Sequence, residues 1–152
     1  MIVEGSHSFA APPETVWPLL LDPEVIGHAM PGARELVLVE PGKYRGSLKV
    51  AIGPITAAEF ALGISIENPE APRQFDMIVD ANGKFGFTRG KAHVSLHPED
   101  GGTRMAYRAE LNVGGKIASV GQRLLDVVSR TMLRSGLEDL GREVQRRLAE
   151  GG

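Results

Sequence analysis

Four histidines are the side chains in this sequence best suited to metal binding or acid–base chemistry. His93 and His97 are four residues apart, a spacing that would place both rings on one face of a helix and let them share a metal ion. The surrounding pattern predicts a strand, where four residues span about 13 Å, so we expect two separate surface histidines. His28 is interpreted as a surface residue near the end of a short helix. His7 falls on the inward face of a first strand, where it could bond a ligand or occupy an ordinary core position.

The tyrosines, acids and glycine-rich strings add no recognisable catalytic set. Tyr44 and Tyr107 fall on inward faces, where a buried hydroxyl usually finds a local partner; contact with a quinone carbonyl is the alternative. Glu59 and Asp76 have no evident partner that would mark a proton-transfer pair. The Gly-Gly-Lys string at 114–116 lacks the upstream glycine and the following serine or threonine of a phosphate-binding loop. We therefore expect no catalytic residues, no metal site and no cofactor.

The composition is that of one ordinary globular domain. With 152 residues, 42% of them hydrophobic and 24% charged, the chain can bury a core without disulfides or metals, and residues 1–150 are expected to form a single domain. The absence of cysteine excludes disulfides and thiol nucleophiles, and a net charge of −2 gives no basis for nucleic acid binding. We find no secretory signal and no apolar run of roughly 20 residues. The expected location is the cytoplasm, with peripheral contact at the inner face of the membrane left open.

The elements that would position these side chains follow from the periodicity of the sequence. Alternation over residues 3–9 predicts a strand, and helical spacing predicts two short helices between residues 13 and 31. From about 35 to 113, turn signals separate segments of period two, which indicates an antiparallel sheet with one covered face. Apolar residues at spacings of three and four over 117–148 predict an amphipathic helix of about 48 Å. This order predicts an α+β helix-grip fold, in which a curved antiparallel sheet of about six to seven strands surrounds the long C-terminal helix.

A curved sheet and a straight helix leave a gap, and the residue pattern does not decide whether this gap is filled. Inward positions include Gly46, Gly90 and Ala92, which remove side-chain volume, and four methionines, which adapt to variable contents. However, glycines in strands also mark bulges, and methionines also fill ordinary cores. An apolar pocket and a solid core both remain open at this point, and periodicity alone slightly favours the core.

Several strings carry a resemblance to a known family. They are Ala11-Pro12-Pro13-Glu14-Thr15-Val16-Trp17, Asp22-Pro23-Glu24-Val25, Pro31-Gly32, and Gly114-Gly115-Lys116-Ile117-Ala118 followed by Gly121-Gln122-Arg123-Leu124. On these residues the chain resembles START-like proteins of the polyketide cyclase or Bet v 1 type over nearly its whole length. Within them it is similar to the family of the carbon monoxide dehydrogenase G subunit, mainly through the Asp-Pro…Pro-Gly and Gly-Gly-Lys…Gly-Gln-Arg strings.

The resemblance implies a pocket for a lipid-like molecule and an accessory role beside a molybdenum-containing CO dehydrogenase or a related hydroxylase. It implies either carriage of a quinone or recruitment of the enzyme to the membrane. Longer members add a hydrophobic C-terminal tail, which this sequence lacks, so we expect no direct anchoring. Together with the inward-reading positions, the resemblance predicts that the pocket is lined by His7, Phe9, Trp17, Leu21, Met30, Phe60, Leu62, Met77, Val79, Gly90, Ala92, Val94, Met105, Tyr107, Ala109, Leu124, Val128 and Met132.

Three functions are therefore considered. The first is a non-enzymatic carrier of a hydrophobic small molecule, and the second is an assembly or membrane-recruitment factor for the same enzyme with an incidental cavity. The third is a cyclase or hydrolase that would use inward polar groups such as His7 and Tyr107. The arginines between Arg123 and Arg147 could face anionic lipid or an acidic partner protein, although the acids between them favour a solvated helix face.

Overall fold

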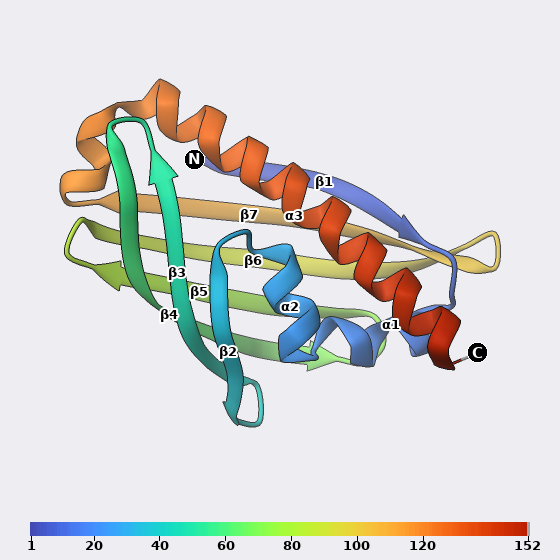
Figure 1. Ribbon diagram of the computed structural model, residues 1–152. Helices are drawn as coiled ribbons and strands as arrows, with labels where there is room; N and C mark the ends of the chain where they lie inside the picture. The colour runs from blue at the N-terminus through green and yellow to red at the C-terminus, as the bar shows by residue number, and fades with distance from the viewer. Residues whose placement is uncertain (152) are drawn as a thin grey trace.

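A seven-stranded antiparallel sheet curves around three α-helices in the computed structural model, which describes residues 1–151 (Figure 1). In chain order the elements are β1 Ile2–Phe9, α1 Pro13–Leu20, α2 Pro23–Ala29, β2 Ala33–Glu40, β3 Lys43–Ile52, β4 Ile55–Glu70, β5 Gln74–Gly83, β6 Gly86–Glu99, β7 Gly102–Gly114, the 3₁₀ helix η1 Lys116–Val120, and α3 Gln122–Gly151. The predicted α+β helix-grip fold is confirmed.

The order of the strands brings the first and the last strand of the chain together. The strand order is β1-β7-β6-β5-β4-β3-β2, so the first strand pairs with the last one, and α1 and α2 carry the chain across to the opposite edge at β2. Helix α3 then crosses diagonally over the concave face (Figure 1). The inner face of the sheet is apolar. Its residues lie beside one another on neighbouring strands, as Tyr44 does beside Ile64 and Leu48 beside Phe60.

The two short helices lie where the proline and acidic residues of the sequence indicate helix starts. Pro13 and Pro23 each occupy a first turn, where the missing N–H costs nothing. The side chain of Asp22 caps α2 by accepting a hydrogen bond of 2.8 Å from the backbone N–H of Glu24. The chain leaves α2 through Gly32 at φ +92°, where a side chain would collide with the carbonyl oxygen of Lys49.

The C-terminal helix differs from the predicted continuous helix. Residues 116–120 form a 3₁₀ turn, and Gly121 breaks the chain direction at φ +99° before α3 begins. The break leaves residues 116–120 outside α3. Within α3, Leu125 is buried, whereas Val127, which the sequence pattern placed inward, is 56% exposed.

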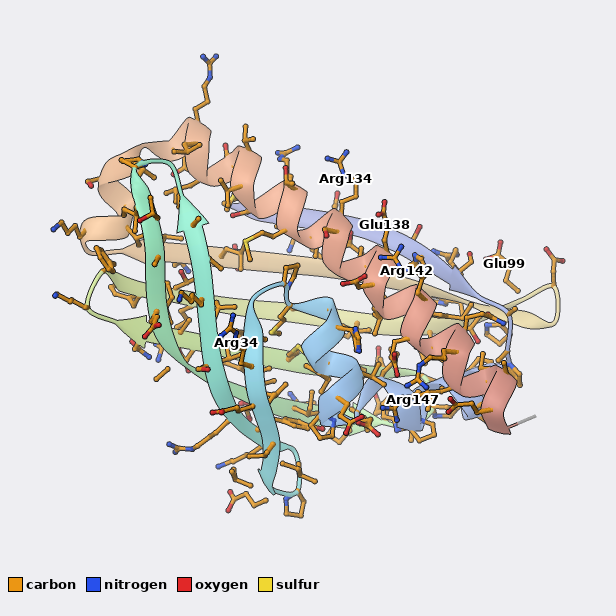
Figure 2. All side chains as sticks on the ribbon, in the orientation of Figure 1. Arg34, Glu99, Arg134, Glu138, Arg142 and Arg147 are labelled. Carbon is orange, nitrogen blue, oxygen red and sulfur yellow. The ribbon has the colours of Figure 1, made fainter. Side chains whose placement is uncertain are left out.

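An ion-pair cluster fixes the C-terminal half of α3 to the short helices. The guanidinium group of Arg147 contacts Asp22 Oδ2 at 3.0 Å, Glu24 Oε2 at 2.8 Å and Glu143 Oε1 at 2.9 Å. His28 Nε2 lies 3.4 Å from the other Glu143 oxygen. Figure 2 shows Arg147 pointing from α3 toward the junction of α1 and α2. The helix is thus held at the end that lies over α1 and α2.

Candidate ligand-binding cavity

A cavity of about 340 Å³ lies between the concave face of the sheet and α3. This volume falls within the range of small-molecule pockets, roughly 300–1,000 Å³. Its walls come from the inner faces of β3 to β7, the segment that joins α2 to β2, and the inward side of α3. The polar residues at its lining are Thr88, Lys91, Tyr107 and Ser129, and the others are apolar or glycine. Lys91 is itself exposed.

The empty volume arises from small residues on the floor of the cavity. Met77, Ala92 and Ala109 stand side by side on β5, β6 and β7, so two of the three positions beneath α3 carry only a methyl group. In the next row Gly90 stands beside Leu111, whose Cδ2 would lie 2.8 Å from a Cβ at that glycine. Because the sheet curves away from the helix here, these short side chains cannot reach the opposite wall.

Four methionines from four different elements border the same volume. Met30 follows α2, Met77 is on β5, Met105 is on β7 and Met132 is on α3. Met105 is buried, and the other three are partly exposed. Unbranched thioether side chains change rotamer at low cost and pack well against contents of different shapes. The walls can therefore adjust to more than one ligand.

Most of the residues that the sequence placed at a pocket do border the cavity. They are Met30, Phe60, Leu62, Met77, Val79, Gly90, Ala92, Val94, Met105, Tyr107, Ala109, Val128 and Met132. Their common feature is an inward position in a strand of period two or on the inward side of α3.

The remaining expected residues lie elsewhere. Phe9 and Trp17 belong to a closed core cluster at the α1 end of the molecule, against which Leu21 also packs. The Trp17 ring meets Phe75 edge-on at 5.4 Å, so that end of the gap is filled. Leu124 packs with a second cluster and lies over Gly53, whereas the adjacent residue Leu125 borders the cavity.

His7 also lies away from the cavity lining. Its ring packs against α3 at Gly141, where a Cβ would lie 2.5 Å from His7 Nε2, and tilts against Phe9 at a centroid distance of 5.0 Å. The imidazole borders a groove on the surface between β1 and α3.

The sequence reasoning missed lining residues of two kinds. Leu48, Val50, Phe75 and Leu111 lie in strands of period two, but nothing in their spacing distinguishes a position at the gap from one in the closed core. A second group, which includes Leu125 and Leu133, lies on α3 next to the expected residues Val128 and Met132. The helical repeat predicts a side of the helix but not how wide a strip of it borders the cavity.

The two inward tyrosines have different surroundings. The Tyr44 hydroxyl donates a hydrogen bond of 2.5 Å to the carbonyl oxygen of Leu21, and burial followed by the nearby charge of Asp22 raises the pKa of this tyrosine. Tyr44 therefore joins β3 to α1 and has a structural role. Tyr107 borders the cavity, burial raises its pKa, and its hydroxyl has no hydrogen-bond partner among residues 1–151. Tyr107 is the inward tyrosine that is free to bind a ligand.

The acid–base groups outside the cavity form a surface pair that the sequence did not reveal. His93 Nδ1 lies 2.8 Å from Asp76 Oδ1 across β5 and β6, and hydrogen bonds from His93 and then from Asn68 lower the pKa of Asp76. The expectation that Asp76 has no partner is therefore wrong. The pair alternates with the inward residues Met77 and Ala92 and so faces away from the cavity. Within the described chain, no group of three or more potential ligands could hold a metal ion.

Residues 5–145 match the family model that describes the G subunit of carbon monoxide dehydrogenase, CoxG. The chain belongs to this family. The CoxG match spans most of the sequence, including all seven strands in part or whole and most of α3. A comparison with curated proteins gave no match.

Solved structures similar to this CoxG-family chain share its fold over nearly their full length. A conserved protein from Geobacillus kaustophilus is 25% identical with a TM-score of 0.86, and the similarity covers 96% of each chain. A protein from Thermus thermophilus is 20% identical with a TM-score of 0.67, covering 97% of this chain and 99% of that one. Ara h 8.0201 is 15% identical with a TM-score of 0.63, covering 96% and 98%. These matches show that the chain shares the fold of these proteins. Over residues 1–151, no helix is both long and apolar enough to cross a membrane.

Proposed function

We propose that this protein binds and carries a hydrophobic small molecule, a quinone or a lipid-like compound. The observation that carries the proposal is the apolar cavity of about 340 Å³ beneath α3. Membership of the CoxG family supports an accessory role beside a molybdenum-containing CO dehydrogenase or a related hydroxylase. In this role the protein would work in the cytoplasm, at the inner face of the membrane.

Binding in such a cavity depends on removing apolar surface from water. A ligand that buries about 300 Å² of apolar surface would gain on the order of 7 kcal/mol before the entropic cost of association. The methionine walls limit strain for ligands of different shapes. The net affinity should therefore be moderate, which suits a carrier that must also release its cargo.

The proposal assigns binding rather than catalysis to the cavity. Lys91 is the charged residue among the described lining, and it occupies the exposed strand position between the inward residues Gly90 and Ala92. General acid–base catalysis needs a positioned proton donor or acceptor within hydrogen-bond reach of the substrate. Tyr107, with a pKa raised by burial, supplies a hydrogen-bond donor and is poorly suited to act as a base.

The direct test combines ligand identification with a filled cavity. Native mass spectrometry of the protein from its own host should reveal a bound apolar compound, and menaquinone or ubiquinone analogues should displace a neutral fluorescent probe such as N-phenyl-1-naphthylamine. Ala92→Phe adds a ring to the cavity floor and should reduce probe binding at least tenfold. Ala61→Phe is the matched control, because Ala61 is exposed on β4 between the buried residues Phe60 and Leu62. Wild-type protein that binds neither the probe nor any quinone analogue would refute the proposal.

The second candidate is an assembly factor for the same enzyme, and one observation favours it. Val37, Leu38 and Val39 are each about half exposed on β2, an edge strand of the sheet. Exposed apolar edge strands often pair with other chains. If this function holds, Ala92→Phe should leave capture of the dehydrogenase intact, whereas Leu38→Lys should reduce it. Loss of ligand and partner together in Ala92→Phe would favour the carrier instead.

A further inference from the structure

A surface groove between β1 and α3 adjoins the cavity. Its lining consists of the β1 segment 2–7, Tyr107 on β7, and Arg130, Leu133, Arg134, Leu137 and Glu138 on α3. Val3, Tyr107, Leu133 and Leu137 also border the internal cavity. These four residues therefore lie at the boundary where the apolar cavity meets the groove.

The smallest residue that borders the groove at this point is Gly5. This glycine occupies an inward position of β1, between the inward residues Val3 and His7, and yet it is exposed. Its cross-strand neighbour is Tyr107, whose hydroxyl oxygen would lie 2.5 Å from a Cβ at residue 5. Only the absence of a side chain at residue 5 lets the tyrosine hydroxyl reach this point. The Tyr107 hydroxyl, which has no hydrogen-bond partner in the described chain, thus lies where the cavity and the groove meet.

The α3 side of the groove carries arginines that have no acidic partner. Arg130 and Arg134 are one helical turn apart and form no ion pair within the described residues, although Arg142, Arg146 and Arg147 further along α3 all do. Figure 2 shows Arg134 projecting from α3 on the side along which β1 runs. The guanidinium groups of Arg130 and Arg134 therefore border the groove without a direct ion pair to a described carboxylate.

Two acids border the same groove and reduce its positive charge. Glu4 is compensated by Arg108 at 3.7 Å. Glu138 is one turn beyond Arg134 and, like it, forms no ion pair within residues 1–151; Figure 2 shows it on the same side of α3. The positive end of the groove is therefore the one formed by Arg130 and Arg134.

We propose that the groove binds the anionic head of an amphiphile whose hydrocarbon part occupies the cavity. This inference rests on the proposed function, since it needs the cavity to hold the hydrocarbon. The negatively charged oxygens of a carboxylate or a phosphate ester pair with Arg130 and Arg134, and the Tyr107 hydroxyl donates a hydrogen bond at the junction. The apolar chain sets the affinity, and the arginines select an anion over a neutral head of the same length.

The test compares ligands that share one chain and differ in the head. Dodecanoate, dodecyl phosphate and dodecanol are titrated against the full chain loaded with N-phenyl-1-naphthylamine, which is uncharged. Dodecanoate and dodecyl phosphate should each bind about fivefold more tightly than dodecanol, the size expected of exposed charge pairs worth about 1 kcal/mol. The advantage should shrink in 0.5 M salt, because exposed charges are screened. An advantage for only one of the two anions identifies the head group and supports the site.

Variants separate the groove from the cavity. The double variant Arg130→Gln and Arg134→Gln should remove the preference for the anion and leave dodecanol binding unchanged. Glu138→Gln should increase the preference, because it removes the unpaired negative charge. Arg123→Gln, which changes an exposed α3 arginine outside the groove, is the matched control and should have no effect.

The outcomes distinguish this inference from the proposed function. Equal affinity for dodecanoate, dodecyl phosphate and dodecanol, unchanged in the double arginine variant, would overturn the head-group site while the carrier function stands. Failure of the probe and of dodecanol to bind would refute the carrier function, and the head-group site with it. A preference for the anions that persisted unchanged in the double arginine variant would also overturn the inference, because the anionic head would then be bound elsewhere.

Discussion

Glu143 is a nearly buried carboxylate at the centre of the ion-pair cluster that holds α3 on the short helices. It accepts hydrogen bonds from Arg146, with Nε at 3.1 Å, and from Arg147, with Nε at 2.9 Å. The hydrogen bonds from Arg146 are the largest cause that lowers the pKa of Glu143 from 4.5 to about 2, and burial opposes them. The charged form is therefore favoured by folding, and the substitution Glu143→Gln removes this contribution while keeping the shape of the side chain.

The size of the effect follows from linkage. One pH unit of pKa displacement corresponds to about 1.4 kcal/mol, so the Glu143 charge stabilises the fold by at most roughly 3 kcal/mol at neutral pH. Arg146 is 54% exposed, and screening by solvent reduces this value. We expect Glu143→Gln to lower the free energy of unfolding by about 1–3 kcal/mol at pH 7.

The sign of the pH dependence is fixed by the lowered pKa. The contribution of Glu143 is complete above the unfolded pKa of about 4.5 and is lost as the pH falls toward 2. By pH 3.5 about 1.4 kcal/mol of the maximum would be lost, because the unfolded chain already binds the proton and the folded one does not. The gap between wild type and Glu143→Gln should therefore narrow from pH 7 to pH 3.5.

Urea unfolding followed by circular dichroism at pH 7, 5 and 3.5 measures both quantities. Glu150→Gln is the matched control, because Glu150 also pairs with Arg146, at 2.6 Å, but is 65% exposed and should change the free energy of unfolding by less than about 0.5 kcal/mol. Equal losses in the two variants would refute the argument from burial. A loss in Glu143→Gln that stayed constant down to pH 3.5 would refute the argument from the pKa.

Two further substitutions test the packing that surrounds the cavity. Thr103 is 1% exposed and donates a hydrogen bond of 2.6 Å to the carbonyl oxygen of Ala11. Thr103→Val leaves that oxygen unpaired and should lower the free energy of unfolding by about 1–3 kcal/mol, measured with urea. An unchanged free energy of unfolding would contradict this prediction. Gly136→Ala should cost about 2 kcal/mol or more, because the new methyl group would collide with the carbonyl oxygen of Ala29 where α3 crosses α2. Gly27→Ala is its control, with no atom within 4 Å of the added methyl group, and should be neutral or stabilising in thermal unfolding.

The sequence by itself determined the order of the elements and the apolar face of each strand. These properties are local: a period of two or of 3.6, a proline in a first turn and a glycine in a tight turn act over a few residues. For this reason the inner-face positions of Tyr44, Phe60, Leu62 and Ala92 follow from the spacing of residues along each strand.

The tertiary structure decided whether that inner face encloses a space. Periodicity reports which side chains face inward but not how far away the opposite wall stands, and that distance depends on the curvature of the whole sheet. Trp17 and Ala92 are both inward residues, yet the first fills its end of the gap and the second leaves a void. The choice between the adjacent residues Leu124 and Leu125 was likewise made by the fold, because it depends on how α3 is seated against the sheet.

Contacts between distant segments were also set only by the fold. Arg147 meets Asp22 and Glu24 across more than 120 residues of sequence, and Gly5 uncovers the hydroxyl of Tyr107 because β1 pairs with the last strand. The residues next to each of these in the sequence do not indicate such contacts. Their roles depend on which surface lies opposite, and that is a property of the assembled sheet and helix.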